Sequence, residues 1–169
     1  MTSDLTARLA DLEARVAALE APSQPEDIAT PPDPDPTFWA LNGLRERLPD
    51  PGGVLLTGEV VLPSGARYAW QEGSTTEGLL EEDWTLRAPR LDALAHPVRL
   101  TVLQEVLRGN GATAGLAALE SLGTPGQLHH HLRPLVAAGW LRSAGRGRYE
   151  VPEARVVPLL VVLTAAAPA

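Results

Sequence analysis

The sequence predicts an α+β protein, because segments with helical spacing of apolar residues are interrupted by two strand–turn–strand patterns. The most informative predicted helix lies between Thr124 and Leu141. Thr124 is a candidate N-cap residue, and Pro125 suits the first helical position. Gln127 can complete a capping box, and Gly139 suits the left-handed residue that ends a helix. The stretch therefore predicts a helix with a defined start and end.

This predicted helix has one apolar face and one polar face. The apolar residues recur at spacings of three and four: Leu128, Leu132, Leu135 and Val136. The opposite face carries no acid and contains Gln127, His129, His130 and Arg133. Such a face can bind base edges and phosphates in a major groove. The alternative is an ordinary amphipathic helix whose polar face contacts only solvent. These residues alone do not decide between a DNA-binding face and a solvent-exposed face.

The segments around this helix have an informative order. Residues 91–108 predict an amphipathic helix with a proline near its start, and residues 113–122 predict a second, short helix. Residues 140–151 predict two short strands around a Gly/Arg turn. Three helices followed by a basic hairpin is the order of a winged helix-turn-helix domain.

Three of these segments resemble the ArsR-type (arsenical-resistance-like) repressor family. Ala93-Leu-Ala-His-Pro-Val-Arg-Leu-Thr-Val-Leu103 is similar to the family's opening helix, L-x-H-P-x-R-L-x-I-L. Residues 126–141 are similar to its recognition helix, and residues 142–149 resemble its wing. The resemblance covers roughly the last half of the chain and implies a dimeric DNA-binding regulator with terminal helices at the dimer interface. The family's metal sensors use cysteine thiolates, and this chain has no cysteine.

The predicted DNA contacts lie on the reading helix and the wing. We expect four reading-helix side chains to approach bases or nearby phosphates: Gln127, His129, His130 and Arg133. The hydroxyl of Thr124 and the backbone amide of Gly126 suit the DNA backbone at the helix start. The wing residues expected to bind phosphate or the minor groove are Arg142, Arg146 and Arg148. In a two-fold dimer the reading helices would lie about 34 Å apart, so the operator would be a rough palindrome.

Charge is unevenly distributed along the chain. Residues 1–84 hold 5 Arg against 16 acidic residues, a net charge of −11. Residues 85–155 hold 9 Arg against 5 acidic residues, a net charge of +4, and residues 156–169 hold no charged side chain. The basic part coincides with the predicted winged domain, as a phosphate-binding surface requires. We expect the acidic half to point away from DNA.

The N-terminal segment, residues 1–20, predicts a parallel coiled coil. Its apolar residues alternate spacings of four and three: Leu5, Leu9, Leu12, Val16 and Leu19. In this register, arginines at g positions face glutamates at e positions of the partner chain: Arg8 with Glu13 and Arg15 with Glu20. A single amphipathic helix packed on its own chain is the alternative. Under three heptads is a marginal length, so we expect other contacts to hold the dimer.

The middle of the chain predicts a proline-rich acidic linker (residues 21–36) and a small module (residues 37–84). The module contains a helix over 37–48, strands over 54–62 and 66–72, and a short acidic helix or turn over 75–84. It holds five of the seven aromatic residues: Phe38, Trp39, Tyr68, Trp70 and Trp84. We favour a small aromatic core. The alternative is a pocket for a small apolar effector, lined by Trp39, Tyr68, Trp70 and Trp84.

The C-terminal run from Val156 to Ala167 is apolar on all sides and predicts a buried helix, with Pro158 in its first turn. We assign it, with residues 85–155, to one winged domain (85–169). The resemblance implies that it contributes to the dimer, through Leu159, Leu160 and Leu163. The run is too short to cross a bilayer, and the chain begins without a signal peptide, so we expect a cytoplasmic protein that does not bind membranes.

Enzymatic chemistry has the least support in the sequence. It contains no nucleophile–base pair, no phosphate-binding glycine loop and no catalytic carboxylate motif. Consecutive histidines on a helix point about 100° apart, so His129, His130 and His131 cannot share one metal. We therefore expect no enzyme, cofactor or metal, and predict a homodimeric transcriptional regulator, a repressor, that binds double-stranded DNA. The alternatives are a protein-interaction scaffold without specific DNA binding, and a sensor of a small-molecule effector.

Overall fold

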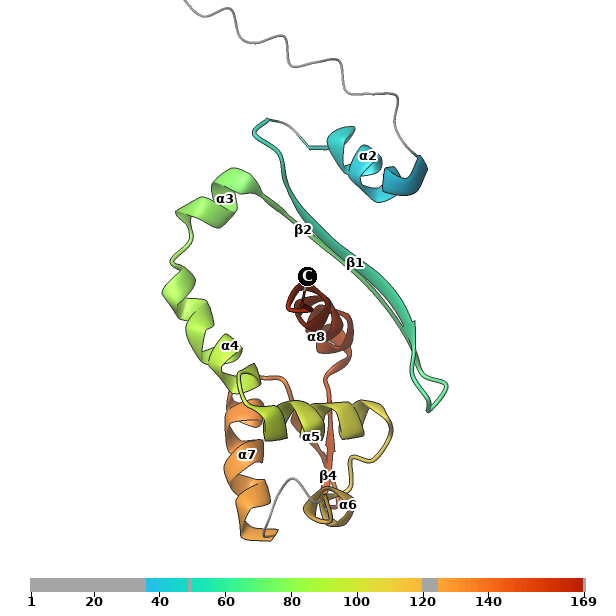
Figure 1. Cartoon of the computed structure of the whole chain (residues 1–169), viewed down its shortest axis with the longest axis vertical. Helices are drawn as coiled ribbons and strands as arrows, with labels where there is room; N and C mark the ends of the chain where they lie inside the picture. The colour runs from blue at the N-terminus through green and yellow to red at the C-terminus, as the bar shows by residue number, and fades with distance from the viewer. Residues whose placement is uncertain (1–35, 49, 120–124, 169) are drawn as a thin grey trace, which may run out of the picture. The chain divides into compact units, whose positions relative to one another are not determined.

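A computed structural model of the chain describes residues 36–48, 50–119 and 125–168 (Figure 1). Within these residues the protein is α+β, with seven α-helices and two β-hairpins. The chain divides into an N-terminal unit, Met1–Arg47, and a C-terminal unit, Leu48–Ala169. The predicted coiled coil (Leu5, Leu9, Leu12, Val16 and Leu19) and almost all of the predicted linker lie outside the described residues.

The described part of the N-terminal unit is a 3-10 turn, η1 (Pro36–Phe38), followed by helix α2 (Trp39–Arg45). The helix ends three residues before the predicted boundary at Leu48. None of its residues is buried. The side chains of Phe38 and Trp39 are exposed by 56% and 73%.

The first hairpin of the C-terminal unit joins β1 (Gly53–Val61) to β2 (Arg67–Thr75). The strands are antiparallel over their full length, with Gly53 opposite Thr75 and Val61 opposite Arg67. The predicted hairpin is confirmed, and β2 extends three residues beyond the predicted end. Thr75 then starts α3 (Thr76–Glu81), because its hydroxyl accepts a hydrogen bond from the Gly78 amide.

This hairpin packs on α8 (Glu153–Ala165), the last helix of the chain (Figure 1). The contact is close at Gly58, where a Cβ would lie 2.8 Å from Cγ1 of Val157. The structure therefore differs from the predicted module 37–84, since the hairpin belongs to the C-terminal unit and α2 does not. Tyr68 packs half-buried against the core of that unit.

The segment predicted as one helix over 91–108 is two helices, α4 (Ala88–Leu94) and α5 (Pro97–Leu107), preceded by the 3-10 turn η2 (Trp84–Arg87). The break falls where Pro97 disfavours helical backbone in the residue before it and supplies no N–H. His96 is extended there, and its Nδ1 accepts a hydrogen bond from the Val98 amide at 3.2 Å. His96 therefore caps the start of α5.

The remaining elements are α6 (Thr113–Ala117), α7 (Pro125–Ala137), β3 (Arg142–Gly145) and β4 (Arg148–Glu150). One core joins α4 to α8, and its largest fully buried side chains are Val102, Leu103, Leu116, Leu128, Leu132, Leu135, Leu141, Val156, Val157 and Leu159. Because α8 begins at Glu153, the prediction that Pro158 lies in the first turn is wrong. In the described part of the chain, no helix is both long enough and apolar enough to cross a membrane.

Candidate nucleic-acid interface

Helix α7 carries the predicted reading face. Its inner face is buried, with Leu128, Leu132 and Leu135 exposed by 2% or less. Val136 was predicted on this face, and that prediction is wrong, because its side chain is 41% exposed. Val136 follows Leu135 by about 100° around the helix, which turns it past the edge of the packed surface.

The predicted polar residues of α7 lie outside the core: Gln127, His129, His130 and Arg133 are all exposed. Gly126 lies in the first turn of the helix, and Thr124 lies outside the described residues. α7 contains no acidic residue. An exposed, acid-free helix face is therefore available for an anionic partner.

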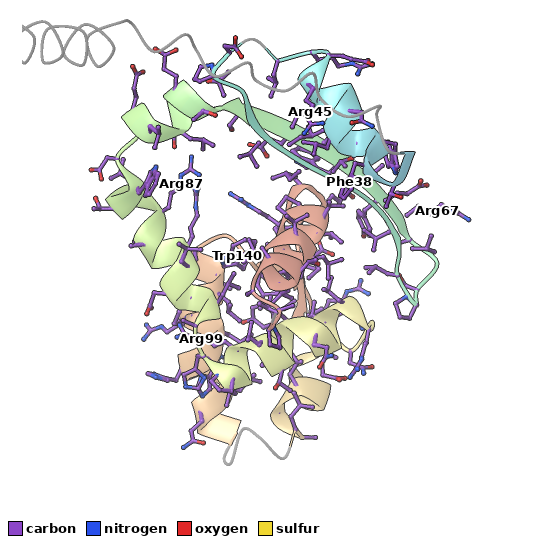
Figure 2. All side chains as sticks on the ribbon, turned by 45° about the horizontal axis from the view of Figure 1, so that its top comes forward. Phe38, Arg45, Arg67, Arg87, Arg99 and Trp140 are labelled. Carbon is purple, nitrogen blue, oxygen red and sulfur yellow. The ribbon has the colours of Figure 1, made fainter. Side chains whose placement is uncertain are left out.

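The end of α7 has the predicted geometry. Gly139 has φ of +74°, its amide donates to the Val136 carbonyl at 3.0 Å, and the Trp140 amide donates to the Leu135 carbonyl at 2.9 Å. This pair of bonds is a Schellman motif, in which glycine takes the left-handed conformation at low cost. Trp140 then donates from Nε1 to the Arg90 carbonyl at 2.9 Å, which joins the exit of α7 to α4 (Figure 2).

The second hairpin, β3–β4, follows this exit at the position predicted for the wing, and we keep the name wing for it. Its three arginines are in different situations. Arg142 donates from Nε to Glu150 at 2.6 Å, and Arg148 donates to the Gly109 carbonyl at 3.3 Å. Arg146 lies at the turn with φ of +50°, and within the described residues no hydrogen bond or ion pair holds its side chain. Of the three, Arg146 is therefore the most available to a phosphate.

The wing is fixed to the loop before α6. The Thr113 amide and hydroxyl both donate to the Gly147 carbonyl, at 2.8 and 2.6 Å, and the Tyr149 amide donates to the Gly111 carbonyl at 2.8 Å. A Cβ at Gly111 would lie 2.2 Å from the Tyr149 carbonyl oxygen, so only glycine allows this approach. The wing is thus held by backbone contacts rather than extending freely.

Reading face and wing share one concave surface. A hollow of about 440 Å³ between them is lined by His129, Leu132, Arg133, Val136, Ala137, Ser143 and Tyr149. Sequence reasoning missed Val136 and Ser143 as members of this surface. Val136 is an apolar residue next to the buried stripe of α7. Because the sequence analysis assigned it to the core, its place in the hollow was not predicted.

His131 differs from the two histidines before it. It is half-buried. Its ring centroid lies 4.8 Å from that of His96, the N-cap residue of α5, and 5.4 Å from that of His130. Burial lowers the pKa of His131, and electrostatic interactions with His96, His130 and Arg99 lower it further. His131 therefore lies partly within the packed side of α7, whereas His129 and His130 are exposed.

Of the residues predicted to line an aromatic effector pocket, Tyr68 lines a hollow of about 180 Å³ that Tyr149 also lines. Trp70 and Trp84 are exposed by 38% and 60%, and their indole N–H groups bond locally, to Glu72 and to the Leu79 carbonyl. An apolar groove of about 440 Å³ lies elsewhere, between α5, α8 and the turn of the first hairpin, and leucines dominate its lining. Among the described residues, no group of three or more His, Asp or Glu side chains is placed to hold a metal.

Comparison of the chain with protein-family models, with curated proteins and with solved structures finds no match.

Proposed function

We propose that this protein is a sequence-specific regulator of transcription that binds double-stranded DNA as a homodimer, through a winged helix-turn-helix domain similar to that of the ArsR family. The observation that carries the proposal is the surface shared by α7 and the wing. The C-terminal unit presents an acid-free helix face, a hollow beside it and, at the wing turn, an arginine without a partner among the described residues. This combination suits a polyanion with readable edges better than it suits a protein partner.

In this proposal, α6 and α7 form the helix-turn-helix, and α7 enters the major groove. Arg133 would donate to guanine, and Gln127 would bind adenine, since these are the pairings that their geometry favours. His129 and His130 extend the same exposed face. Val136 lies in the hollow beside Arg133 and would contact a thymine methyl group.

The wing would supply contacts to the DNA backbone. Arg146 has no competing partner among the described residues, whereas Arg142 must share its guanidinium with Glu150. Residues 85–155 carry +4, which gives this region the local positive charge that phosphate binding requires. Of the 21 acidic residues, 16 precede residue 85 in the sequence.

The homodimer would form through exposed apolar side chains of the C-terminal unit. Leu80, Trp84, Leu86 and Leu91, on the segment from α3 to α4, are exposed by 55–77%. On α8, Leu163 is 39% exposed and Leu160 is half-buried. Leu159 was also predicted at the dimer interface, but it is fully buried in its own chain, so we no longer assign it to that interface. A series of exposed large apolar residues is typical of a surface that is covered by a partner.

Selection of bound DNA from a random pool, with the full-length protein at near-physiological salt, tests the proposal. An inverted repeat whose half-site centres lie about 10 base pairs, or a multiple, apart is the expected result. An Arg133→Ala variant should lose preference at one position of each half-site. Failure to bind DNA at any salt would contradict the proposal, and the protein-interaction scaffold would then be the better explanation.

A further inference from the structure

A compact group of basic side chains joins the reading helix to the rest of the domain. It contains His96, the N-cap residue of α5, with Arg99 of α5 and His130 and His131 of α7, and we call it the junction cluster. The His131 ring contacts the His96 ring with centroids 4.8 Å apart and planes inclined by 51°. The cluster lies where α4, α5 and α7 pack together, near the labelled Arg99 in Figure 2.

Arg99 places a permanent positive charge inside this junction. Its side chain is buried, and its Nε has no hydrogen-bond partner within the described part of the chain. Asp92 of α4 places its carboxylate oxygen Oδ2 3.9 Å from Nη1 of Arg99, and the Asp92 side chain is 80% exposed. Such a distant and solvated carboxylate compensates a buried guanidinium only weakly. A second positive charge in the junction would therefore be poorly tolerated.

The cap at the start of α5 also requires a neutral imidazole, at His96. Its Nδ1 accepts the Val98 amide hydrogen at 3.2 Å and caps the start of α5. A ring nitrogen accepts only when it carries no proton, and both ring nitrogens of an imidazolium are protonated. A proton on His96 would therefore remove the cap and place a charge against His131.

We propose that His131 is a proton-sensitive positioning residue, which through its contact with His96 holds the reading helix α7 on α5 only while both rings are neutral. Acidification would loosen this junction and release the reading helix from its place in the domain. The proposal deepens the proposed DNA-binding function, on which its regulatory meaning rests. Its structural part concerns only the packing of α7 on α5.

The direction of the pH effect follows from linkage. Because the folded protein lowers the pKa of His131, the unfolded chain binds the proton more readily. The stability from this site is complete above the unfolded pKa of about 6.5 and declines as the pH falls through the lowered folded value. The pKa values of Asp83 and Glu105 are also lowered, by hydrogen bonds from the Thr85 hydroxyl and the Asn110 amide. These two carboxylates therefore stay ionised across the range from pH 7.5 to 5.5.

Thermal unfolding of the full chain between pH 7.5 and 5.5 tests the packing. We expect the wild-type Tm to fall by about 4 °C, which corresponds to a modest stability change in a domain of this size. His131→Phe keeps an aromatic ring without a titrating group and should flatten this dependence. His129→Phe, the matched control on the exposed face of the same helix, should keep the wild-type slope. An equal slope in the wild type and His131→Phe would overturn the proposal.

His96→Asn provides an independent test if His131→Phe folds poorly. Asparagine is a good N-cap acceptor and has no proton to gain, so the variant should retain stability at pH 7.5 and lose part of the pH dependence. Hydrogen exchange of α7 amides should quicken at pH 5.5 in the wild type, after correction for the intrinsic rate, and should change less in this variant. Unchanged α7 protection in the wild type at both pH values would contradict the mechanism.

A DNA-binding measurement separates this inference from the proposed function. Between pH 7.5 and 5.5, the affinity of the wild-type protein for the selected operator should fall more than the affinity of the His131→Phe variant. Comparison of the two proteins at each pH removes the effects of pH on DNA binding that both share. Absence of DNA binding at pH 7.5 would contradict the proposed function, whereas a wild-type Tm that is independent of pH would contradict the inference.

Discussion

Leu132 and Val136, one helical turn apart on α7, differ sharply in burial. Leu132 is 2% exposed and Val136 is 41% exposed. Leu132→Ala should lower the free energy of unfolding by about 2–5 kcal/mol, because it leaves a cavity beneath the reading helix. Val136→Ala should change it by less than about 0.5 kcal/mol and should weaken discrimination at one DNA position. Urea unfolding measures the free-energy change of both variants. Equal losses of unfolding free energy in the two variants would show that Val136 belongs to the core.

Arg146 at the wing turn is expected to bind phosphate without reading sequence. Arg146→Ala should weaken binding about equally for operator and random DNA, and should reduce the slope of log affinity against log salt by about 1. Arg67→Ala is the matched control, since Arg67 is an exposed arginine on the other hairpin. Fluorescence anisotropy at several salt concentrations gives both slopes. A loss confined to the operator would instead assign Arg146 to base recognition.

At the residue scale, the sequence predicts which side chains are buried on a regular helix but not which distant residues meet. The exposure of Gln127 and Arg133 follows from helical spacing, because a single buried stripe determines the opposite face. The contact of His131 with His96 could not be predicted in this way. It depends on how α7 crosses α5, and no periodicity within either helix encodes that crossing.

At the element scale, the wing depends on the backbone approach at Gly111. Gly111→Ala would force Cβ against the Tyr149 carbonyl oxygen and should cost about 1–3 kcal/mol of unfolding free energy. Gly115→Ala is the control, since a Cβ there meets open space within α6, and it should be neutral or stabilising by up to about 1 kcal/mol. DNA affinity should fall only for Gly111→Ala. Full affinity in that variant would show that the wing position does not matter for binding.

Element boundaries were predictable where a single residue determines them. Gly139 ends α7, and Pro63-Ser-Gly65 turns the first hairpin, because these residues favour the required backbone locally. The break between α4 and α5 was missed although Pro97 signals it, since the apolar spacing continues through the break. The start of α8 at Glu153 was missed because its first turn is polar, and the prediction followed only the apolar run.

At the scale of the whole molecule, the packing of the first hairpin on α8 joins distant parts of the sequence. The approach of Val157 to Gly58 makes this hairpin part of the C-terminal unit. Composition had suggested a separate aromatic module, because five aromatic residues lie close together in the sequence. Sequence proximity does not create a core, and Trp70 and Trp84 remain on the surface. Leucines and valines from α4 to α8 form the core instead.

At the scale of the whole molecule, the exposed apolar residues from α3 to α4 also predict the oligomeric state, because we expect them to form the dimer interface. Leu86 is 77% exposed, so Leu86→Glu should leave the fold intact and place an unpaired charge in the proposed dimer interface. We expect the dimer dissociation constant to rise by about tenfold or more, and operator binding to weaken with it. Val54→Glu, at an exposed apolar site on β1, is the control and should leave dimerisation unchanged. Sedimentation velocity over a range of concentrations measures these constants. A wild-type protein that stays monomeric, or a Leu86→Glu variant that dimerises as well as the wild type, would remove this surface from the dimer interface.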